Sequence, residues 1–271
     1  MLSPEEVVRI HYVLCRDFQT ADDPIGYGGI KSQALLESAV GRQHAGFGPF
    51  RKYPDPLSNA ATLTFGVCCD HPFHNGNKRT ALVAMLAHLD KNHLTLKGVR
   101  QDELYAVMVE LASRELNLER IPPRVRKRLG VLKYDSDHQV TELSNWLEVR
   151  TERVTRGERR VTYRQVRQLL QPHGYRLAQT QNGNLIDVLK EETQRKGVLR
   201  RDTRTELKSI GRIGYRNEGE TVSVKTMKEL RRLCRLREED GVDSSAFYEG
   251  ADVIDFFINE YRTVLRRLAN T

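Results

Sequence analysis

The chain has 271 residues, of which 39% are hydrophobic and 30% charged, a composition typical of a globular protein with two domains. No stretch approaches the roughly 18 apolar residues that a membrane-spanning helix needs, and the N-terminus lacks the features of a secretion signal. Four scattered cysteines are too few for a disulfide framework. We therefore expect a cytoplasmic protein that has no membrane partner.

The net charge of +8 is distributed unevenly along the chain. Residues 1–120 hold 13 Lys and Arg against 14 Asp and Glu, whereas residues 121–271 hold 31 against 22. The positive excess therefore lies entirely in the second part. This asymmetry predicts a near-neutral domain joined to a basic one.

Residues 1–120 are predicted to form an all-α domain. Ser3, Pro4 and two following carboxylates are typical of a helix start, and the apolar stripe behind them extends to about Phe18. A second apolar helical period covers residues 33–42. Residues 46–56 contain three prolines and predict an ordered surface loop.

Two strongly apolar runs, residues 60–69 and 80–89, predict two helices at the centre of this domain. The polar segment 70–79 lies between the two runs. We therefore expect it to be held between two core helices, as a loop on a rigid scaffold.

A smaller α+β domain is predicted for residues 131–271, after a linker at residues 121–130. Two prolines and four cations without an anion disfavour packing of the linker. Short helices and strands alternate beyond it. Asn182-Gly183 between two β-prone runs predicts a hairpin.

Residues 71–80 have the sequence HPFHNGNKRT and open directly into an apolar helix. A Gly-Asn turn at a helix N-terminus directs backbone N–H groups outward, and Lys78 and Arg79 add two full charges at the same end. This combination predicts an anion site suited to phosphates. The ordinary pKa of His71, which precedes the site, allows it to accept a proton near neutral pH.

The segment resembles the signature of the Fic/Doc family, His-Pro-Phe-x-(Asp/Glu)-Gly-Asn-x-Arg, and matches every fixed position but one. Further residues resemble the death-on-curing (Doc) toxin branch: residues 34–40, 46–48, 53–55 and 78–82. The resemblance covers about residues 3–120 and implies a helical Fic/Doc-like catalytic domain.

The resemblance also implies roles for the residues that match the motif. His71 would be the general base that deprotonates a hydroxyl of a target protein, and Phe73 would be the buried anchor of the motif. ATP would be the co-substrate. The phosphate-binding turn would consist of Gly76, Asn77, Lys78 and Arg79.

Two departures from the family pattern affect these expectations. Asn75 replaces the acidic metal ligand and lacks the charge that holds a hard cation, so Mg²⁺ affinity is expected to be weak. Family members that transfer AMP usually have Gly at the position of Lys78 and a second Arg at the position of Leu82. Because Doc has the Lys and transfers the γ-phosphate, the resemblance favours phosphorylation.

The chain is therefore expected to be a Doc-like toxin or defence effector that transfers a phosphoryl group from ATP to a target hydroxyl. The family suggests a translation elongation factor as the target, and a separate antitoxin as a partner. Two alternatives stay open. One is an AMP-transferring enzyme, and the other is an inactive Fic-like platform with a nucleic-acid-binding C-terminal domain.

The order of helix, hairpin, strand and helix in residues 131–271 loosely resembles the double-stranded-RNA-binding-like fold of HicA toxins. These ribonucleases place a catalytic His in the strand after the hairpin turn, and residues 185–188 contain none, so nuclease activity is not expected. The basic charge predicts RNA or DNA as a partner of this region. Candidate phosphate contacts are Arg176, Lys190, Arg195, Lys196, Arg200 and Arg201.

Overall fold

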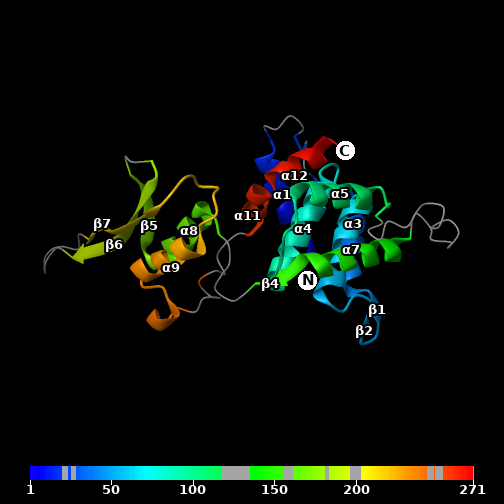
Figure 1. Ribbon diagram of the computed structural model, residues 1–271, viewed down its shortest axis with the longest axis horizontal. Coiled ribbons are helices and arrows are strands. Elements are labelled where there is room, and N and C mark those ends of the chain that lie inside the picture. Colours follow the sequence, from blue (N-terminus) through cyan, green and yellow to red (C-terminus); the bar gives the residue numbers. More distant parts are fainter. Residues whose placement is uncertain are drawn as a thin grey trace. The chain divides into compact units, whose positions relative to one another are not determined.

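The computed structural model divides the chain into two compact units (Figure 1). Unit 1 comprises Met1–Val154 and Glu260–Thr271, and unit 2 comprises Thr155–Asn259. The structure describes residues 1–19, 24–25, 29–116, 135–154, 161–180, 183–195, 203–242, 247 and 253–270.

Unit 1 is mainly helical. Its helices are α1 (Pro4–Asp17), α2 (Gln33–Gly41), α3 (Pro56–Cys69), α4 (Asn77–Lys91), α5 (Gln101–Ala112), α7 (Ser136–Arg150) and α12 (Arg262–Arg267), with 3₁₀ turns at Arg42–His44 and Leu268–Asn270. Two small antiparallel sheets accompany them. One pairs β1 (Gly46–Phe47) with β2 (Phe50–Arg51), and the other pairs β3 (Leu94–Leu96) with β4 (Thr151–Arg153). The all-α expectation for this part of the chain is therefore corrected to helix-rich with small sheets.

The predicted start of α1 is confirmed by its capping. The hydroxyl of Ser3 accepts the amide of Glu6, and the carboxylate of Glu6 accepts the amide of Ser3. The buried face of the helix carries Val7, Ile10 and Leu14. This face packs α1 against α4 and α2.

The two predicted core helices are α3 and α4, which pack against each other. Nearly every side chain of both is buried from the second turn onward. Asp55 caps α3 by accepting the amides of Leu57 and Ser58. The polar segment between the two apolar runs is therefore held by two central helices, as predicted.

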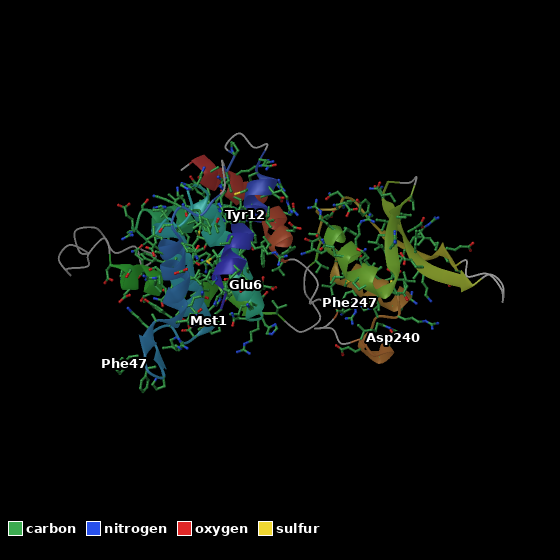
Figure 2. The ribbon with its side chains drawn as sticks, turned by 180° about the vertical axis from the view of Figure 1, so that it is seen from behind. Met1, Glu6, Tyr12, Phe47, Asp240 and Phe247 are labelled. Atoms are coloured by element: carbon green, nitrogen blue, oxygen red, sulfur yellow. The ribbon has the colours of Figure 1, made fainter. Side chains whose placement is uncertain are left out.

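The proline-containing segment before α3 forms the β1–β2 hairpin. Its tip exposes two aromatic side chains, Phe47 at 88% and Phe50 at 77% (Figure 2 labels Phe47). The segment is thus ordered at the surface, as expected, but it contains a short hairpin.

The boundary between the units differs from the one expected from composition. α7 packs against α3, and β4 pairs with β3, so residues 136–153 belong to unit 1. The end of the chain also belongs there, because α12 packs against α5 and the side chain of Gln101 accepts the amide of Val264. Prolines and charge do not reveal which later segments pack against the first core. The linker expected at residues 121–130 lies outside the described residues.

Unit 2 is the α+β part of the chain. Its elements are α8 (Tyr163–Leu170), a 3₁₀ turn (Gln171–His173), β5 (Tyr175–Gln179), β6 (Leu185–Arg195), β7 (Thr203–Gly214), α9 (Val224–Leu233), a second 3₁₀ turn (Glu238–Asp240) and most of α11 (Val253–Glu260). The predicted hairpin is present as β5 and β6, and the sheet order is β5-β6-β7 with antiparallel pairs throughout. Tyr175, Leu177, Ile186 and Val188 share a core with Leu230 of α9.

The described helices include none with the length and apolar character needed to cross a membrane.

Candidate active site

The loop between α3 and α4 has a strained backbone at one end and a glycine at the other. His71, directly after the C-cap Asp70, has a φ of 51°, in the left-handed region that a non-glycine residue rarely adopts. Gly76, the N-cap of α4, has a φ of 71°. This left-handed conformation favours glycine, and a Cβ at Gly76 would also lie close to the side chain of Ile25, 3.0 Å from its Cδ1.

Hydrogen bonds within the loop hold its shape. Nδ2 of Asn77 donates to the carbonyl of Phe73 at 2.9 Å, and Oδ1 of Asn77 accepts the Phe73 amide at 3.0 Å. Oδ1 of Asn75 accepts the amide of Gly76 at 2.6 Å. The side chain of Asn77 therefore closes the loop on itself.

A second segment pairs with the loop along its edge. The amides of Lys31 and Ser32 donate to the carbonyl of Pro72, at 2.7 and 3.2 Å, and Ile30 forms a β-bridge with Phe73. This pairing brings Lys31, which lies forty residues earlier in the chain, beside the loop.

Behind the loop, Phe73 is buried and its ring stacks on the ring of His11, with centroids 3.9 Å apart. Nδ1 of His11 lies 3.0 Å from the hydroxyl of Thr80 on α4. Burial, together with the charge of Arg79, lowers the pKa of His11 to about 4. A neutral imidazole from α1 thus supports the loop from within the core.

Positive charge surrounds His71. Desolvation lowers its pKa first, and the charges of Lys31, Lys78 and Arg114 lower it further, while Asp70 acts in the opposite direction. His71 is therefore neutral at pH 7 and can accept a proton. The start of α4 adds the partial positive charge of the helix dipole at the same place.

Three features thus meet in one loop. His71 has a left-handed backbone, the side chain of Asn77 closes the turn by hydrogen bonds to Phe73, and cations lie around the neutral ring of His71. Residues 1–89 match the family model described as Fic/DOC family. We call this matched part of the chain the Fic domain. The match ends before residue 120, which is where the resemblance in the motifs is expected to end. No curated protein matches the chain.

The expected phosphate-binding residues of the Fic motif do not lie in one environment. Lys78 is half-buried and its charge acts on His71, whereas Arg79 is 1% exposed. The guanidinium of Arg79 lies 5.4 Å from the ring centre of Phe18 on the α1 side. Asn77 and Gly76 shape the loop through their contacts within it.

Sequence reasoning missed Arg114 as a neighbour of the Fic motif. Its backbone has a φ of 54°, and its guanidinium donates to the carbonyl of Cys69 at 3.3 Å, at the end of α3. Nothing in the local sequence signals this contact, because Arg114 comes more than forty residues after His71. Lys31 follows two glycines in the sequence, and a cation in such a loop is a weak indication of an anion-binding residue.

The Fic loop does not offer a hard cation the ligands it prefers. Asn75 supplies an amide oxygen where the family has a carboxylate, and that oxygen accepts the Gly76 amide. In the part of the chain that the structure describes, no three His, Cys, Asp or Glu residues form a group that could hold a metal ion. The residues present therefore do not fit a dedicated Mg²⁺ site.

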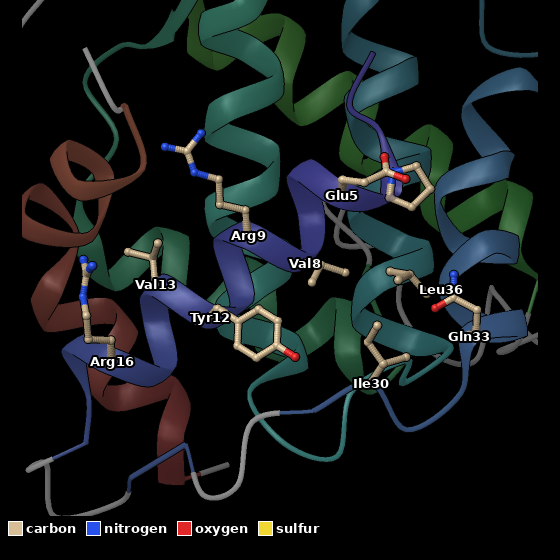
Figure 3. Close-up of a pocket in the computed structure, with 10 residues that line it drawn as sticks. Glu5, Val8, Arg9, Tyr12, Val13, Arg16, Ile30, Gln33 and Leu36 are labelled. Carbon is tan, nitrogen blue, oxygen red and sulfur yellow. The ribbon is translucent and has the colours of Figure 1, made fainter. Parts of the chain in front are cut away.

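A groove of about 650 Å³ lies along the outer face of α1 (Figure 3). Its lining includes Val8, Tyr12, Ile30 and Leu36, with Arg9 at its side. No residue of the HPFHNGNKRT segment lines it. The groove adjoins the Fic loop only through Ile30, the bridge partner of Phe73.

The C-terminal candidates are only partly described. Arg176 forms an ion pair with Glu191 across the sheet, and Lys190 on β6 lies opposite Lys208 on β7. Lys196, Arg200 and Arg201 lie outside the described residues, as does the side chain of Arg195.

Proposed function

We propose that the Fic domain transfers the γ-phosphoryl group of ATP to a hydroxyl of a target protein, with His71 as the general base. Members of the Fic/Doc family are generally transferases that move a nucleotide-derived group to a target. The observation that carries the proposal is the neutral imidazole of His71 among the charges of Lys31, Lys78 and Arg114.

In the proposed reaction, His71 takes the proton of a Ser or Thr hydroxyl. The hydroxyl oxygen then forms a bond to the γ-phosphorus, the bond between that phosphorus and its bridging oxygen breaks, and ADP leaves. The lowered pKa keeps His71 able to accept the proton. Lys78 and the start of α4 would hold the phosphates, because cations and helix N-termini stabilise anionic oxygens.

Transfer of AMP is the alternative, and the two reactions differ in the phosphorus atom that is attacked. Incubation of the full chain with γ-labelled ATP and a cell lysate should label a protein, whereas α-labelled ATP should not. Labelling from α-labelled ATP would assign AMP transfer instead. Because the loop lacks a carboxylate ligand, labelling should persist when EDTA replaces Mg²⁺.

Two variants of the Fic loop make the labelling experiment specific. His71→Ala should abolish labelling, while His74→Ala, which removes an exposed imidazole three residues away, should leave it intact. If the wild type labels nothing and Asn75→Asp restores labelling, the loop is a degenerate site, as in the inactive-platform alternative.

The proposed biological role is growth arrest. Expression of the wild-type chain should stop cell growth, and expression of His71→Ala should not. A translation elongation factor as target and a separate antitoxin as partner remain proposals from the resemblance to Doc. Identification of the labelled protein by mass spectrometry tests the first of these.

A further inference from the structure

One side of α9 in unit 2 presents a row of cations. Lys225, Lys228 and Arg232 are spaced by three and four residues, which places them on one face of the helix. Arg235 follows three residues later, just past the helix. All four side chains are exposed, and none forms an ion pair with any residue that the structure describes.

Two lysines of the β6–β7 hairpin extend this row. Lys190 and Lys208 are direct partners across the two strands, and Lys190 is also the partner of Tyr175 on β5. Partners across a sheet share a face, and Tyr175 belongs to the core that α9 covers. The charge of Arg235 acts on Tyr175, so the row on α9 ends near these two lysines.

We refer to Lys225, Lys228, Arg232, Arg235, Lys190 and Lys208 as the basic ridge. Acidic residues that the structure describes adjoin the ridge but form no ion pair with it. Glu229 is the single acidic residue of α9, the charge of Arg235 acts on Asp240, and Glu192 lies opposite Glu206 two residues beyond the lysine pair. Like charges directly opposite each other, as at Lys190 and Lys208, cost folding free energy that a bound anion would relieve.

Several other cations of unit 2 that the structure describes have ion-pair partners. Arg212 pairs with Asp187 at 2.7 Å and Arg176 pairs with Glu191, both across neighbouring strands. Arg167 pairs with Glu218 at 2.7 Å. The cations of the basic ridge differ from these three arginines, because none of them forms an ion pair with a residue that the structure describes.

The chemistry of the ridge favours the phosphate backbone of a nucleic-acid duplex. Protein interfaces have apolar cores and are depleted in lysine, whereas phosphate contacts are made by exposed Lys and Arg. Binding of unpaired bases needs aromatic stacking platforms, and every Phe and Tyr of unit 2 that the structure describes is buried. A duplex offers a regular row of phosphates without requiring either feature.

We propose that the basic ridge binds double-stranded nucleic acid through its phosphates, without reading the base sequence. This inference goes beyond the proposed transferase and does not depend on it. It keeps Lys190 among the expected phosphate contacts and adds the cations of α9 and Lys208.

The test measures binding of the full chain to RNA and DNA duplexes of about 20 base pairs by fluorescence anisotropy, at roughly 50 to 200 mM salt. Wild-type affinity should fall linearly with the logarithm of salt concentration. The triple variant Lys225→Gln/Lys228→Gln/Arg232→Gln should weaken binding at least tenfold and reduce the salt slope by about two to three. Comparison of the affinities for the two duplexes shows whether RNA or DNA binds more tightly.

A matched control removes three cations that have partners. Arg176→Gln/Arg212→Gln/Arg216→Gln causes the same change of charge in the same unit, because Arg216 pairs with Glu220. This control should weaken binding less than about threefold. Equal weakening by both triple variants would overturn the proposal, as would absence of binding to either duplex at the lowest salt.

Two single variants and a competing polyanion test the charge of the ridge directly. Glu229→Gln should tighten binding, a gain that misfolding cannot produce, and unchanged affinity in that variant would contradict the ridge. His71→Ala should bind duplexes as the wild type does, so failure of the transferase proposal leaves this test intact. Displacement of the duplex by polyglutamate at equal charge would assign the ridge to acidic proteins and overturn the proposal.

Discussion

Lys78 and Arg79 are adjacent in the sequence but face different surroundings. Successive residues of a helix point about 100° apart, so neighbours at its first turn face different partners. Lys78 is half-buried and acts on His71, whereas Arg79 is buried beside Phe18 and acts on His11. The motif alone suggests one common role for the two cations, and the structure separates them.

We expect different losses from the two alanine variants. Lys78→Ala should weaken ATP binding by about 2–3 kcal/mol, the scale of a lost charge-assisted contact, with little change in stability. Arg79→Ala should lower the free energy of unfolding by about 2–3 kcal/mol, because it empties a buried site. Calorimetric titration with ATP and urea unfolding measure the two effects. Loss of ATP binding at full stability in Arg79→Ala would show that this residue faces the nucleotide.

The pKa of His71 offers a direct test of the surrounding charges. Its NMR titration midpoint should lie below the ordinary value of 6.5, because desolvation and three cations disfavour the charged ring. Arg114→Gln should raise the midpoint by removing one of those charges. The distant surface variant Arg153→Gln serves as a control and should leave the midpoint unchanged. If the titration midpoint of His71 does not change in Arg114→Gln, the guanidinium of Arg114 does not lie near His71.

At the scale of elements, two buried histidines connect the helices of the Fic domain. His11 joins α1 to α4 through Thr80, and His88 joins α4 to α3, with Nε2 2.9 Å from Oδ1 of Asn59. Burial is the largest cause that lowers the pKa of each ring to about 4. Both rings are therefore neutral in the folded protein at physiological pH.

These two histidines predict a loss of stability in mild acid. Because their pKa is about 4 when folded and 6.5 when unfolded, the unfolded chain binds more protons between these values, and stability falls as the pH falls from 6.5 to 4. The full loss is roughly 3 kcal/mol for each residue. Urea unfolding at several pH values measures it. The variants His11→Asn and His88→Asn should flatten the pH dependence, and an unchanged slope would contradict the assignment.

The crossing of α2 over α3 depends on a glycine. A Cβ at Gly66 would lie 2.8 Å from Cα of Ala39, closer than packed atoms approach, and the contact is to backbone that cannot rotate away. Gly66→Ala should therefore cost about 1–3 kcal/mol of unfolding free energy. Gly41→Ala is the matched control at the end of α2, where a Cβ meets nothing within 4 Å. Equal free energies of unfolding for the two variants would contradict this prediction, because they would show that α2 and α3 can move apart without loss of stability.

At the scale of the whole molecule, each unit has buried residues of its own. The core of unit 2 includes Val188, and unit 1 buries Leu143 and Trp146 on α7. Trp146 is the single tryptophan of the chain, and its Nε1 donates to Glu103 at 3.1 Å. Its fluorescence therefore reports on unit 1 alone.

We predict that variants in the two cores affect different unfolding transitions. Val188→Ala should destabilise unit 2 by about 2 kcal/mol and shift the circular-dichroism transition, while the midpoint of Trp146 fluorescence stays unchanged. Leu143→Ala should shift the fluorescence midpoint instead. The measurement is urea unfolding followed by both signals. A fluorescence midpoint that moves with Val188→Ala would show that the units unfold as one.

Much of the Fic domain could be predicted from local sequence. Capping by Ser3, the apolar runs of α3 and α4, and the turn at Gly76 depend on neighbours within a few residues, so their signals are contiguous. The hairpin at Asn182-Gly183 is local for the same reason. These features determined the helices, the loop and the family resemblance.

Contacts between distant segments were decided only by the tertiary structure. α7 belongs to unit 1 although it follows the proline-containing segment, and α12 returns to unit 1 after the whole of unit 2. No composition signal marks either placement. Lys31 and Arg114 reach His71 from opposite directions along the chain, and Arg79 is buried because α1 covers that side of α4. The sequence of one helix shows which side chains share a face. It does not show which element packs against that face, because this depends on contacts with segments far away in the chain.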